Sequence, residues 1–410
     1  VYLAGPADRD PAQQLVGAEI VLRAGRPENG GKVDLIPLDP AIDPALKAEL
    51  LALKNPPPIQ IPAKQRYGAW SASPETLVPS DIKFFGGKAS NFGLLRRSIP
   101  AQSPPALAFS IDLWDDFMAQ TLFDGKALRA EIRERLAAFR YPPNMTALTE
   151  RLASVRRLIT DTARFSAAQK QAVSNALQGF QPEQRIRFRS STNIEDSEQF
   201  TGAGLYDSFS GCLADDLDAD DQGPCRCDPT ESKERGVFRA IQKVYASFYN
   251  DNAYLERLRH GINEDDVGMG LLVHYSAPDE TELANGVATL QVRINPASTY
   301  YVGELVTQLG AVSVSNPDSS ARPESVAASR FSRDTFLTRK EQSSVVQLGA
   351  HVMDWEKDYR ALIELFYRVT TEFQRHHPAK KSFTLDFEYK KLRPGLLSVK
   401  QVRQLPEAPV

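Results

Sequence analysis

Four polar side chains near the carboxyl end have the types and spacing of a site for a metal ion and a phosphate. Asp386 and Glu388 are two residues apart in FTLDFEY, so both point to one face of the predicted strand. Gln401 and Arg403 have the same relation on the next predicted strand, and the turn KLRPG joins the two strands as a hairpin. Carboxylate oxygens completed by substrate phosphates suit Mg²⁺, and an arginine binds a phosphate with two parallel hydrogen bonds. A solvated hairpin with an ordinary ion pair explains the same spacing, and spacing alone favours that explanation.

Two segments earlier in the chain have residues suited to binding phosphate groups. In FFGGKASNFGLL, Gly86 and Gly87 allow main-chain N–H groups to approach a phosphate, and Lys88 adds positive charge at a helix start. The spacing is not that of a Walker motif. In FRSSTNIEDSEQFTGAGLYDSF, Arg189 precedes three hydroxyl residues, two acidic residues and a glycine-rich stretch, which suits holding a terminal phosphate. An ordinary turn explains the first segment equally, and a polar turn with a helix cap explains the second.

Taken together, these segments resemble the ATP-binding domain of the phosphoenolpyruvate synthase and pyruvate phosphate dikinase family. GGKASNFGLL is similar to that family's GGKGANL-type segment, and RSSTNIEDSEQFTGAGLYDSF to its RSSATAED…FAGQ-type segment. LDFEYKKLRPGLLSVKQVRQLP resembles its closing DIEW…IVQARP-type hairpin. AIQKVYASFYNDNAYLERL, GMGLLVHY and ANGVATL fall where the family's long helix and hinge strands fall. The resemblance covers roughly residues 80–407 and implies a two-lobed α+β ATP-grasp nucleotide-binding fold.

The resemblance implies how the phosphates would be held. Lys88 and Arg189 take the place of the family's phosphate-holding residues in the first lobe, with Gly86 and Gly87 beside them. Arg403 takes the place of the arginine that faces the transferring phosphoryl group. Lys88, Arg189 and Arg403 would thus be the catalytic cations, neutralising charge on the β- and γ-phosphates.

The resemblance also implies sites for the metal ion and the base. Glu388 and Gln401 correspond to the family's Mg²⁺ ligands, and Asp386 supports them. Main-chain groups around Val273 and His274 correspond to the hinge that meets the adenine. The implied cofactors are therefore ATP and Mg²⁺.

Three departures limit what the resemblance implies. The family passes the phosphoryl group to a histidine in a GGxxSH-type motif on a swivelling domain, and none of the chain's histidines has that context: His260, His274, His351, His376 and His377. No barrel-like acceptor domain follows before Val410. Ala311 occupies the approximate place of an acid in the family's GLGE-type segment. We therefore expect the phosphoryl acceptor to be an absent domain, a separate chain or a small molecule.

Apolar patterns divide the chain into three predicted parts. Residues 1–75 combine short apolar runs with proline-rich connectors, which predicts a β-rich appendage and a linker. Residues 76–265 form the predicted first lobe, with a strand at IKFF (82–85), a strand at 185–191, and helices at 90–97, 111–121, 126–139, 145–160 and 232–249. Residues 266–410 form the predicted second lobe, with strands at 267–275, 284–292, 383–389 and 396–402 and a helix at 353–376.

The three cysteines fall within one acidic segment. A disulfide from Cys212 to either Cys225 or Cys227 and three free thiols are both open. A zinc site would need a fourth ligand, and no histidine lies nearby. The alternating acids from Asp216 to Asp220 lack the glycine and glutamate of a calcium loop. The segment is predicted to be an exposed, solvated insertion outside the site.

Composition excludes several classes of partner. Of 410 residues, 42% are hydrophobic and 25% charged, and the net charge of -3 gives no basic excess for nucleic acid. No apolar run approaches the ~18 residues that cross a bilayer. The chain starts at Val1 without a signal peptide, so we expect a processed piece of a longer protein. Family resemblance favours the cytoplasm, and the clustered cysteines favour a secreted or periplasmic setting.

The predicted function is Mg²⁺-dependent ATP binding and phosphoryl transfer by a dikinase-like phosphotransferase. Its partners would be a nucleotide and an acceptor domain or chain. A second hypothesis is a nucleotide-binding, regulatory or interaction module that has lost turnover, which the alanine at position 311 and the missing histidine domain favour. A third, ATP-dependent carboxylate ligation, has no recognisable acceptor site.

Overall fold

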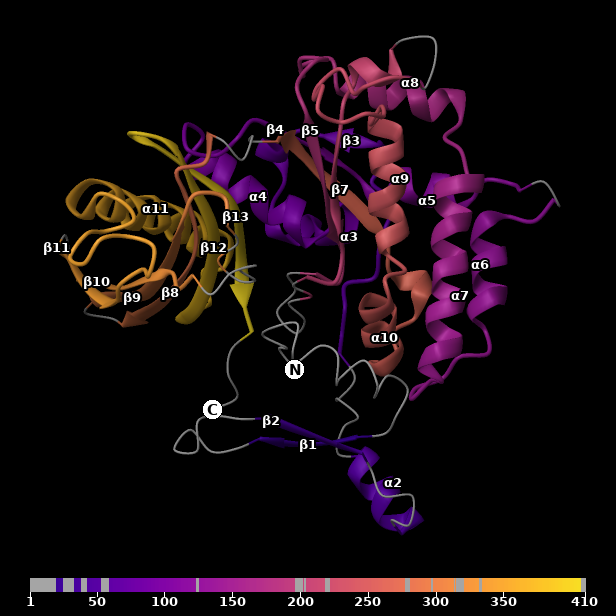
Figure 1. The fold of residues 1–410 in the computed structure, drawn as a ribbon, viewed down its shortest axis with the longest axis horizontal. Coiled ribbons are helices and arrows are strands. Elements are labelled where there is room, and N and C mark those ends of the chain that lie inside the picture. Colours follow the sequence, from indigo (N-terminus) through magenta and orange to yellow (C-terminus); the bar gives the residue numbers. More distant parts are fainter. Residues whose placement is uncertain are drawn as a thin grey trace.

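The computed structural model describes residues 20–24, 33–37, 43–52, 59–122, 125–195, 202, 204–217, 222–276, 281–295, 298–312, 314, 321–331 and 334–406. Within these ranges the chain is a mixture of helices and antiparallel sheets with two large hydrophobic cores. We call the part with the five-stranded sheet the helical lobe, and the part with the six-stranded sheet the sheet lobe. Figure 1 shows the sheet lobe on the left and the helical lobe on the right.

The helical lobe has its sheet at the centre, with strands in the order β3–β4–β7–β5–β6. These strands are β3 (Ser71–Ala72), β4 (Ala106–Phe109), β5 (Ile186–Thr192), β6 (Ser208–Gly211) and β7 (Met269–Tyr275). The helices are α5 (Ile111–Met118), α6 (Leu128–Leu136), α7 (Met145–Arg157) with a π-helical turn at Leu158–Thr162, α8 (Ala167–Ala176), α9 (Val237–Ser247) and α10 (Asp251–Arg259). As predicted, the apolar stripe along α9 is buried in the core of this lobe.

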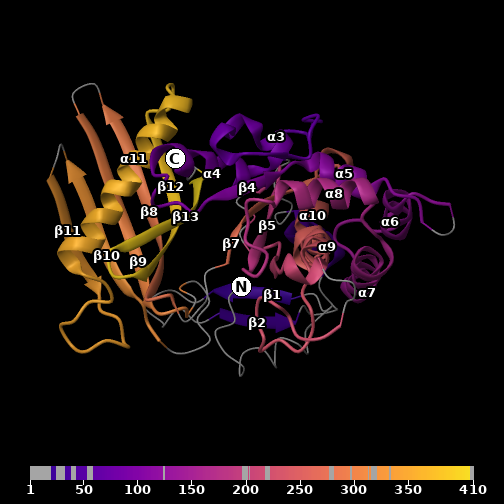
Figure 2. The same ribbon diagram turned by 90° about the horizontal axis from the view of Figure 1, so that it is seen from above.

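The sheet lobe is an antiparallel sheet in the order β11–β10–β9–β8–β12–β13, covered on one face by a long helix (Figure 2). Its strands are β8 (Ala284–Asn295), β9 (Ser298–Leu309), β10 (Glu324–Phe331), β11 (Asp334–Glu341), β12 (Ser382–Arg393) and β13 (Leu396–Leu405). The helix α11 (Arg360–His376) continues a π-helical turn at Trp355–Tyr359. Phe366 of α11 stacks on Phe387 of β12 with ring centroids 4.2 Å apart, so the predicted apolar stripe packs against the hairpin.

Helix α4 (Gly87–Ser98) joins the two lobes. Its side chains Phe92 and Leu95 are buried in the core of the sheet lobe. Arg97 near its end pairs with Glu372 of α11 at 2.8 Å. Because side chains alternate along a strand, the helical lobe's sheet also contributes to both cores. Leu271 of β7 faces the helices of its own lobe, whereas Leu272 lies in the core shared with α4.

Two features differ from the sequence prediction. IKFF is not a strand but the short helix α3 (Ile82–Phe85). Hydrogen bonds form a turn at each end of it: before the helix the Asp81 carboxylate accepts from the Val78 N–H, and at its end the Gly86 N–H donates to the Ile82 carbonyl. A four-residue run with three apolar side chains does not distinguish helix from strand. The predicted division at residue 265 precedes β7, yet β7 pairs with β4 and β5 of the helical lobe.

The amino-terminal part contains an antiparallel pair, β1 (Ile20–Ala24) with β2 (Val33–Pro37), followed by helix α2 (Pro44–Ala52). These elements lie within residues 1–75, the predicted appendage and linker. Most of the remaining predicted appendage and linker lies outside the described residues.

Replacing Phe366 with alanine should lower the free energy of unfolding by about 3–5 kcal/mol, because a fully buried ring is removed from the packing between α11 and β12. Phe336→Ala on β11 is the matched control, since that ring is 61% exposed, and it should change stability by about 0.5 kcal/mol or less. Denaturant unfolding of both variants measures the difference. Equal losses would contradict the assignment of the core.

Candidate functional site

The face of β12 that points away from α11 carries the predicted acids. Side chains along this strand alternate between the core and the opposite face, and the core set is Phe383, Leu385, Phe387 and Tyr389. Asp386, Glu388 and Lys390 lie on the opposite face, so the two carboxylates do share a surface as the sequence predicted. Across the hairpin, Asp386 pairs in register with Arg403, and Glu388 with Gln401.

A β-bulge changes which side chains β13 presents beside these acids. Glu388 is opposite Gln401, whereas the next residue, Tyr389, is opposite Val399, which leaves Lys400 as the extra residue. A bulge turns the strand, so Lys400 and Gln401 both face the acids although they are adjacent in sequence. The Lys400 ammonium lies 3.4 Å from the Glu388 carboxylate.

Arg189 connects the helical lobe to this hairpin. It lies on β5, and its guanidinium donates to the Gln401 amide oxygen at 2.5 Å, to the Lys400 carbonyl at 3.0 Å and to the Glu388 carboxylate at 3.3 Å. Its side chain is 11% exposed. Three predicted site residues therefore lie in contact: Arg189, Glu388 and Gln401. Arg189 is about 200 positions from the other two in the sequence.

The cations around Glu388 determine its charge state. Burial raises the pKa of this carboxyl group, but the surrounding positive charges outweigh burial and lower the pKa to about 2. The strongest of these charges are Arg189 and Lys400, followed by Lys88 and Arg403. Burial in turn lowers the pKa of Lys400. Glu388 is therefore an anion throughout the physiological range, as a metal ligand must be.

The remaining predicted cations have partners beside this group. Arg403 donates to Asp386 through its Nε at 2.8 Å, so the two residues form a pair next to Glu388. Lys88 donates to the main-chain carbonyl of Ser190 at 2.9 Å and lies 3.5 Å from Glu195. Lys88 thus contacts β5 at Ser190, the residue after Arg189.

Gly86 is required for close packing between α4 and β5. It adopts φ +79°, and a Cβ there would lie 2.0 Å from the Ser191 carbonyl oxygen. Its N–H donates to Ile82, so that group is not available to a phosphate. Gly87 starts α4 and is buried, and the Ser191 hydroxyl accepts from the Ala89 N–H at 2.9 Å. The glycine pair therefore fixes Lys88 against β5.

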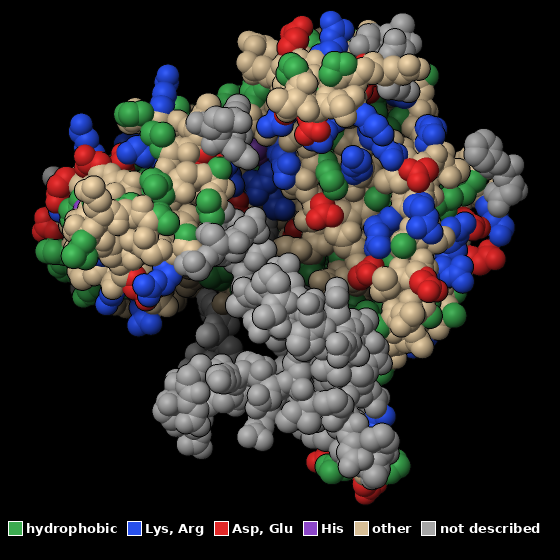
Figure 3. All heavy atoms as spheres, viewed as in Figure 1, with side chains coloured by type: hydrophobic (Ala, Val, Ile, Leu, Met, Phe, Trp, Pro, Cys, Tyr) green, Lys and Arg blue, Asp and Glu red, His purple; other side chains and the backbone are tan. Residues whose placement is uncertain are grey.

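A cavity of about 800 Å³ lies beside Arg189, between the two lobes. Its lining includes the cations Arg187, Arg189, Lys390 and Lys400, the apolar side chains Leu392, Leu396 and Leu397, and His274. Figure 3 shows lysine and arginine side chains inside the hollow between the lobes. A second cavity, of about 370 Å³, lies among α5, α6 and α10; its lining is mainly apolar and includes none of the predicted site residues.

The two predicted hinge residues have different positions. Val273 is fully buried in the core of the helical lobe, and β7 is paired on both sides, so main-chain groups there face β4 and β5. The His274 side chain lines the cavity instead. Its Nδ1 lies 2.8 Å from the Tyr275 carbonyl oxygen, and its buried Nε2 has no partner among the described residues. Burial, together with Arg189, lowers the pKa of His274 to about 3, so the ring is neutral.

Sequence analysis did not identify Arg187, Lys390 or Lys400. Lys390 could have been predicted to share the face of Asp386 and Glu388, because it follows them at the same two-residue period. Lys400 could not be predicted in this way. Strict alternation places its side chain on the other face of β13 from Gln401, and only the bulge brings both side chains to the same face. Lys390 also pairs with the buried Glu282.

The cysteine segment is exposed only in part: among its described residues, 217, 222–224, 226, 229 and 230 are exposed as predicted, whereas Cys212, Asp215 and Cys225 are buried. Cys212 and Cys227 form a disulfide, one of the two pairings left open, and Cys225 is a buried free thiol. Asp215 is buried and accepts hydrogen bonds from two main-chain N–H groups, so it is structural rather than solvated. Asp218 and Asp220 lie outside the described residues, as do Asp196 and part of the glycine-rich stretch.

A positively charged cleft between two lobes, with an ionised carboxylate among its cations, is typical of proteins that bind nucleotides with a metal ion. The family described as pyruvate phosphate dikinase, AMP/ATP-binding domain, matches residues 82–357. The chain belongs to this family, which confirms the predicted resemblance and supports nucleotide binding. No curated protein sequence matches the chain. Among the described residues, no helix is long and apolar enough to cross a membrane.

The matched range contains Lys88, Arg189 and His274 but ends before the hairpin with Glu388 and Gln401. The hairpin's place in the site therefore rests on its contacts with Arg189.

Gly86→Ala should destabilise the protein much more than Gly125→Ala. Both glycines have φ near +80°, which costs an alanine about 1–2 kcal/mol, but a Cβ at Gly125 would meet open space. Only Gly86→Ala adds a clash with the backbone of β5. Denaturant midpoints of the two variants measure this, and equal shifts would show that the approach of α4 to β5 is not a constraint.

Proposed function

We propose that this chain binds ATP together with Mg²⁺ in the cleft between its lobes, in an ATP-grasp arrangement, and takes part in phosphoryl transfer. The observation that carries the proposal is the contact of Arg189 with Glu388 and Gln401, since it places a guanidinium from one lobe against candidate metal ligands of the other. The family assignment to AMP/ATP binding supports the same cleft.

The residues present fit a Mg²⁺ ion. Glu388 is ionised and its side chain is 30% exposed, and Gln401 offers an amide oxygen beside it. Oxygen ligands of this kind, completed by phosphates, are those that Mg²⁺ uses. When bound, Mg²⁺ would neutralise negative charge on the phosphates. Asp386, paired with Arg403, would orient that arginine toward the cleft.

The cations of both lobes would hold the phosphates. Lys88 and Arg189 come from the helical lobe, and Lys400 and Arg403 from the hairpin, so a polyphosphate between them would be bound from two sides. Cations that are fixed before the substrate arrives stabilise charge that develops on the transferring group without further reorganisation.

His274 would recognise the adenine. Hydrogen bonding of Nδ1 to the Tyr275 carbonyl assigns the proton to Nδ1, which leaves Nε2 as an acceptor. That acceptor is buried in the wall of the cavity. The exocyclic amine of adenine is a donor that would satisfy it, whereas guanine has a carbonyl oxygen at the same position. The leucines of the cavity would cover the faces of the base.

A second candidate function is nucleotide binding without transfer. The observation that favours it is Ala311, which lies on an exposed turn after β9 where the family pattern has an acid. Single-turnover assays with ATP and Mg²⁺, in which water serves as the phosphoryl acceptor, separate the two candidates: transfer to water releases phosphate and leaves a cleaved nucleotide, whereas binding alone leaves ATP intact.

Glu388→Gln should remove most of the Mg²⁺ dependence of ATP binding. The amide lacks the charge that attracts the metal ion, so affinity for Mg²⁺-ATP should fall roughly 10–100-fold. Affinity for ATP without metal should rise, because Arg189 and Lys400 lose an anionic competitor. Titration calorimetry with and without Mg²⁺ measures both.

The control for this experiment is Glu364→Gln, a carboxylate on α11 that pairs with Arg330 away from the cleft. It should leave both affinities unchanged. If Glu388→Gln alters neither affinity while the parent chain binds ATP, the hairpin is not the metal site.

His274→Phe should reduce the preference for ATP over GTP roughly tenfold, because the ring is kept and the acceptor is lost. His376→Phe, on the last turn of α11, is the control. Since His274 is neutral well above pH 3, the preference in the parent chain should not change between pH 5 and 8 through this group. If His274→Phe changes the affinities for ATP and GTP equally, His274 Nε2 does not accept a hydrogen bond from the adenine amine.

A further inference from the structure

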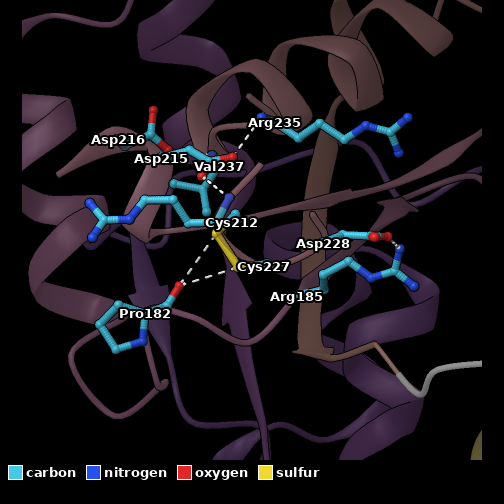
Figure 4. The surroundings of a disulfide bond; sticks show 10 residues. Pro182, Arg185, Cys212, Asp215, Asp216, Cys227, Asp228, Arg235 and Val237 are labelled. Atoms are coloured by element: carbon cyan, nitrogen blue, oxygen red, sulfur yellow. Dashed lines mark hydrogen bonds and ion pairs between the residues drawn. A yellow bond between two sulfur atoms is a disulfide. The ribbon is translucent and has the colours of Figure 1, made fainter. Parts of the chain in front are cut away.

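Four potential metal ligands converge in the helical lobe, on the segment that links β6 to α9. We call Cys212, Asp215, Cys225 and Cys227 the cysteine cluster. The sulfur atoms of Cys212 and Cys225 and a carboxylate oxygen of Asp215 all lie within 4.8 Å of one another. The sulfur of Cys227 is bonded to that of Cys212. Figure 4 shows the disulfide with Asp215 and Pro182 beside it.

The cluster is buried and its ligands are held in place by the main chain. Cys212, Asp215 and Cys225 are each at most 3% exposed. The two carboxylate oxygens of Asp215 accept from the N–H groups of Arg226 and Arg235 at 2.8 and 2.7 Å. Each of these oxygens keeps a second lone pair for a metal ion. Such fixed outer partners orient a ligand before the metal binds.

The groups around the Cys225 sulfur act on it in opposite directions. The main-chain N–H groups of Cys227 and Asp228 donate toward its sulfur, which stabilises negative charge there. Burial and the neighbouring Asp215 act in the opposite direction and raise the pKa of this thiol.

We propose that the cysteine cluster, when its disulfide is reduced, binds one Zn²⁺ ion through three sulfurs and the Asp215 carboxylate. Structural zinc sites are tetrahedral, with Zn–S near 2.3 Å and Zn–O near 2.0 Å, so ligand atoms are about 3.5–3.8 Å apart. The observed spread needs only small side-chain adjustments to reach this. Asp215 supplies the fourth ligand that no histidine provides. The proposal does not rest on nucleotide binding.

The disulfide and the metal ion exclude each other. A dithiol reductant that passes two electrons and two protons to the Cys212–Cys227 bond gives two thiols and becomes a disulfide itself. Zn²⁺ then displaces the thiol protons into solvent as the sulfurs coordinate it. A disulfide oxidant reverses this: it accepts two electrons from the Cys212 and Cys227 thiolates and becomes a dithiol, while the S–S bond forms and the ion is released. Either state connects the residues after β6 to the start of α9, where Cys212 already donates to the Arg235 carbonyl at 2.7 Å.

The test is Co²⁺ titration of the whole chain, because thiolate ligands give tetrahedral Co²⁺ an intense charge-transfer absorption. Protein reduced with a phosphine should bind one equivalent, and Zn²⁺ should displace it. Protein that keeps its disulfide should show no such band. Cys225→Ser and Asp215→Asn should each weaken binding at least tenfold in the reduced state. Asp228→Asn is the matched control, a nearby acid paired with Arg185, and should bind like the parent.

Circular dichroism shows whether the reduced chain stays folded, and each result then supports or contradicts the proposal. If the reduced chain stays folded and binds no Co²⁺, or binds it equally well after Cys225→Ser and Asp215→Asn, the proposal is wrong. If reduction unfolds the chain, recovery of structure on adding Zn²⁺ supports the site, and failure to recover overturns it.

Discussion

The contact of Arg189 with the closing hairpin is the interaction on which the arrangement of the cleft depends. A guanidinium on the central sheet of one lobe donates to an amide, a carbonyl and a carboxylate of the other lobe, and it is almost fully enclosed. Leaving such a charge without partners in this environment would be costly, so the two lobes are held at a fixed approach. The relative position of the two lobes in turn determines the shape of the cavity and the distances between the acids and the remaining cations.

The electrostatic balance of the cleft follows from the same contact. Glu388 is kept ionised by cations on both walls, and one of them, Lys400, is present only because of a β-bulge. A β-bulge leaves one residue of the strand unpaired and changes the face to which a side chain points. Here it places an ammonium group beside a carboxylate that also faces Arg189.

Sequence periodicity was enough to predict the faces of the hairpin and the stripes of α9 and α11, because each rests on a regular repeat. The grouping of Arg189, Glu388 and Gln401 came instead from the family resemblance, because the motifs occur in a characteristic order, whereas spacing alone favoured an ordinary ion-paired hairpin. Periodicity was not enough where particular hydrogen bonds or an irregularity in strand pairing decide the outcome. Lys400 faces the site through a bulge, IKFF turns into a helix through hydrogen bonds to its flanks, and Asp215 is buried because main-chain groups far along the segment point at it.

The position of β7 in the sheet has a consequence for how the molecule folds. Although it is among the last strands of the helical lobe along the chain, it lies between β4 and β5, and no other strand joins those two. A polypeptide emerging in order would have made every helix from α5 to α10 before their sheet could close. Leu272 of the same strand then contributes to the core shared with the sheet lobe. The two halves are therefore expected to gain stability together, as one cooperative unit rather than as two domains that fold in succession.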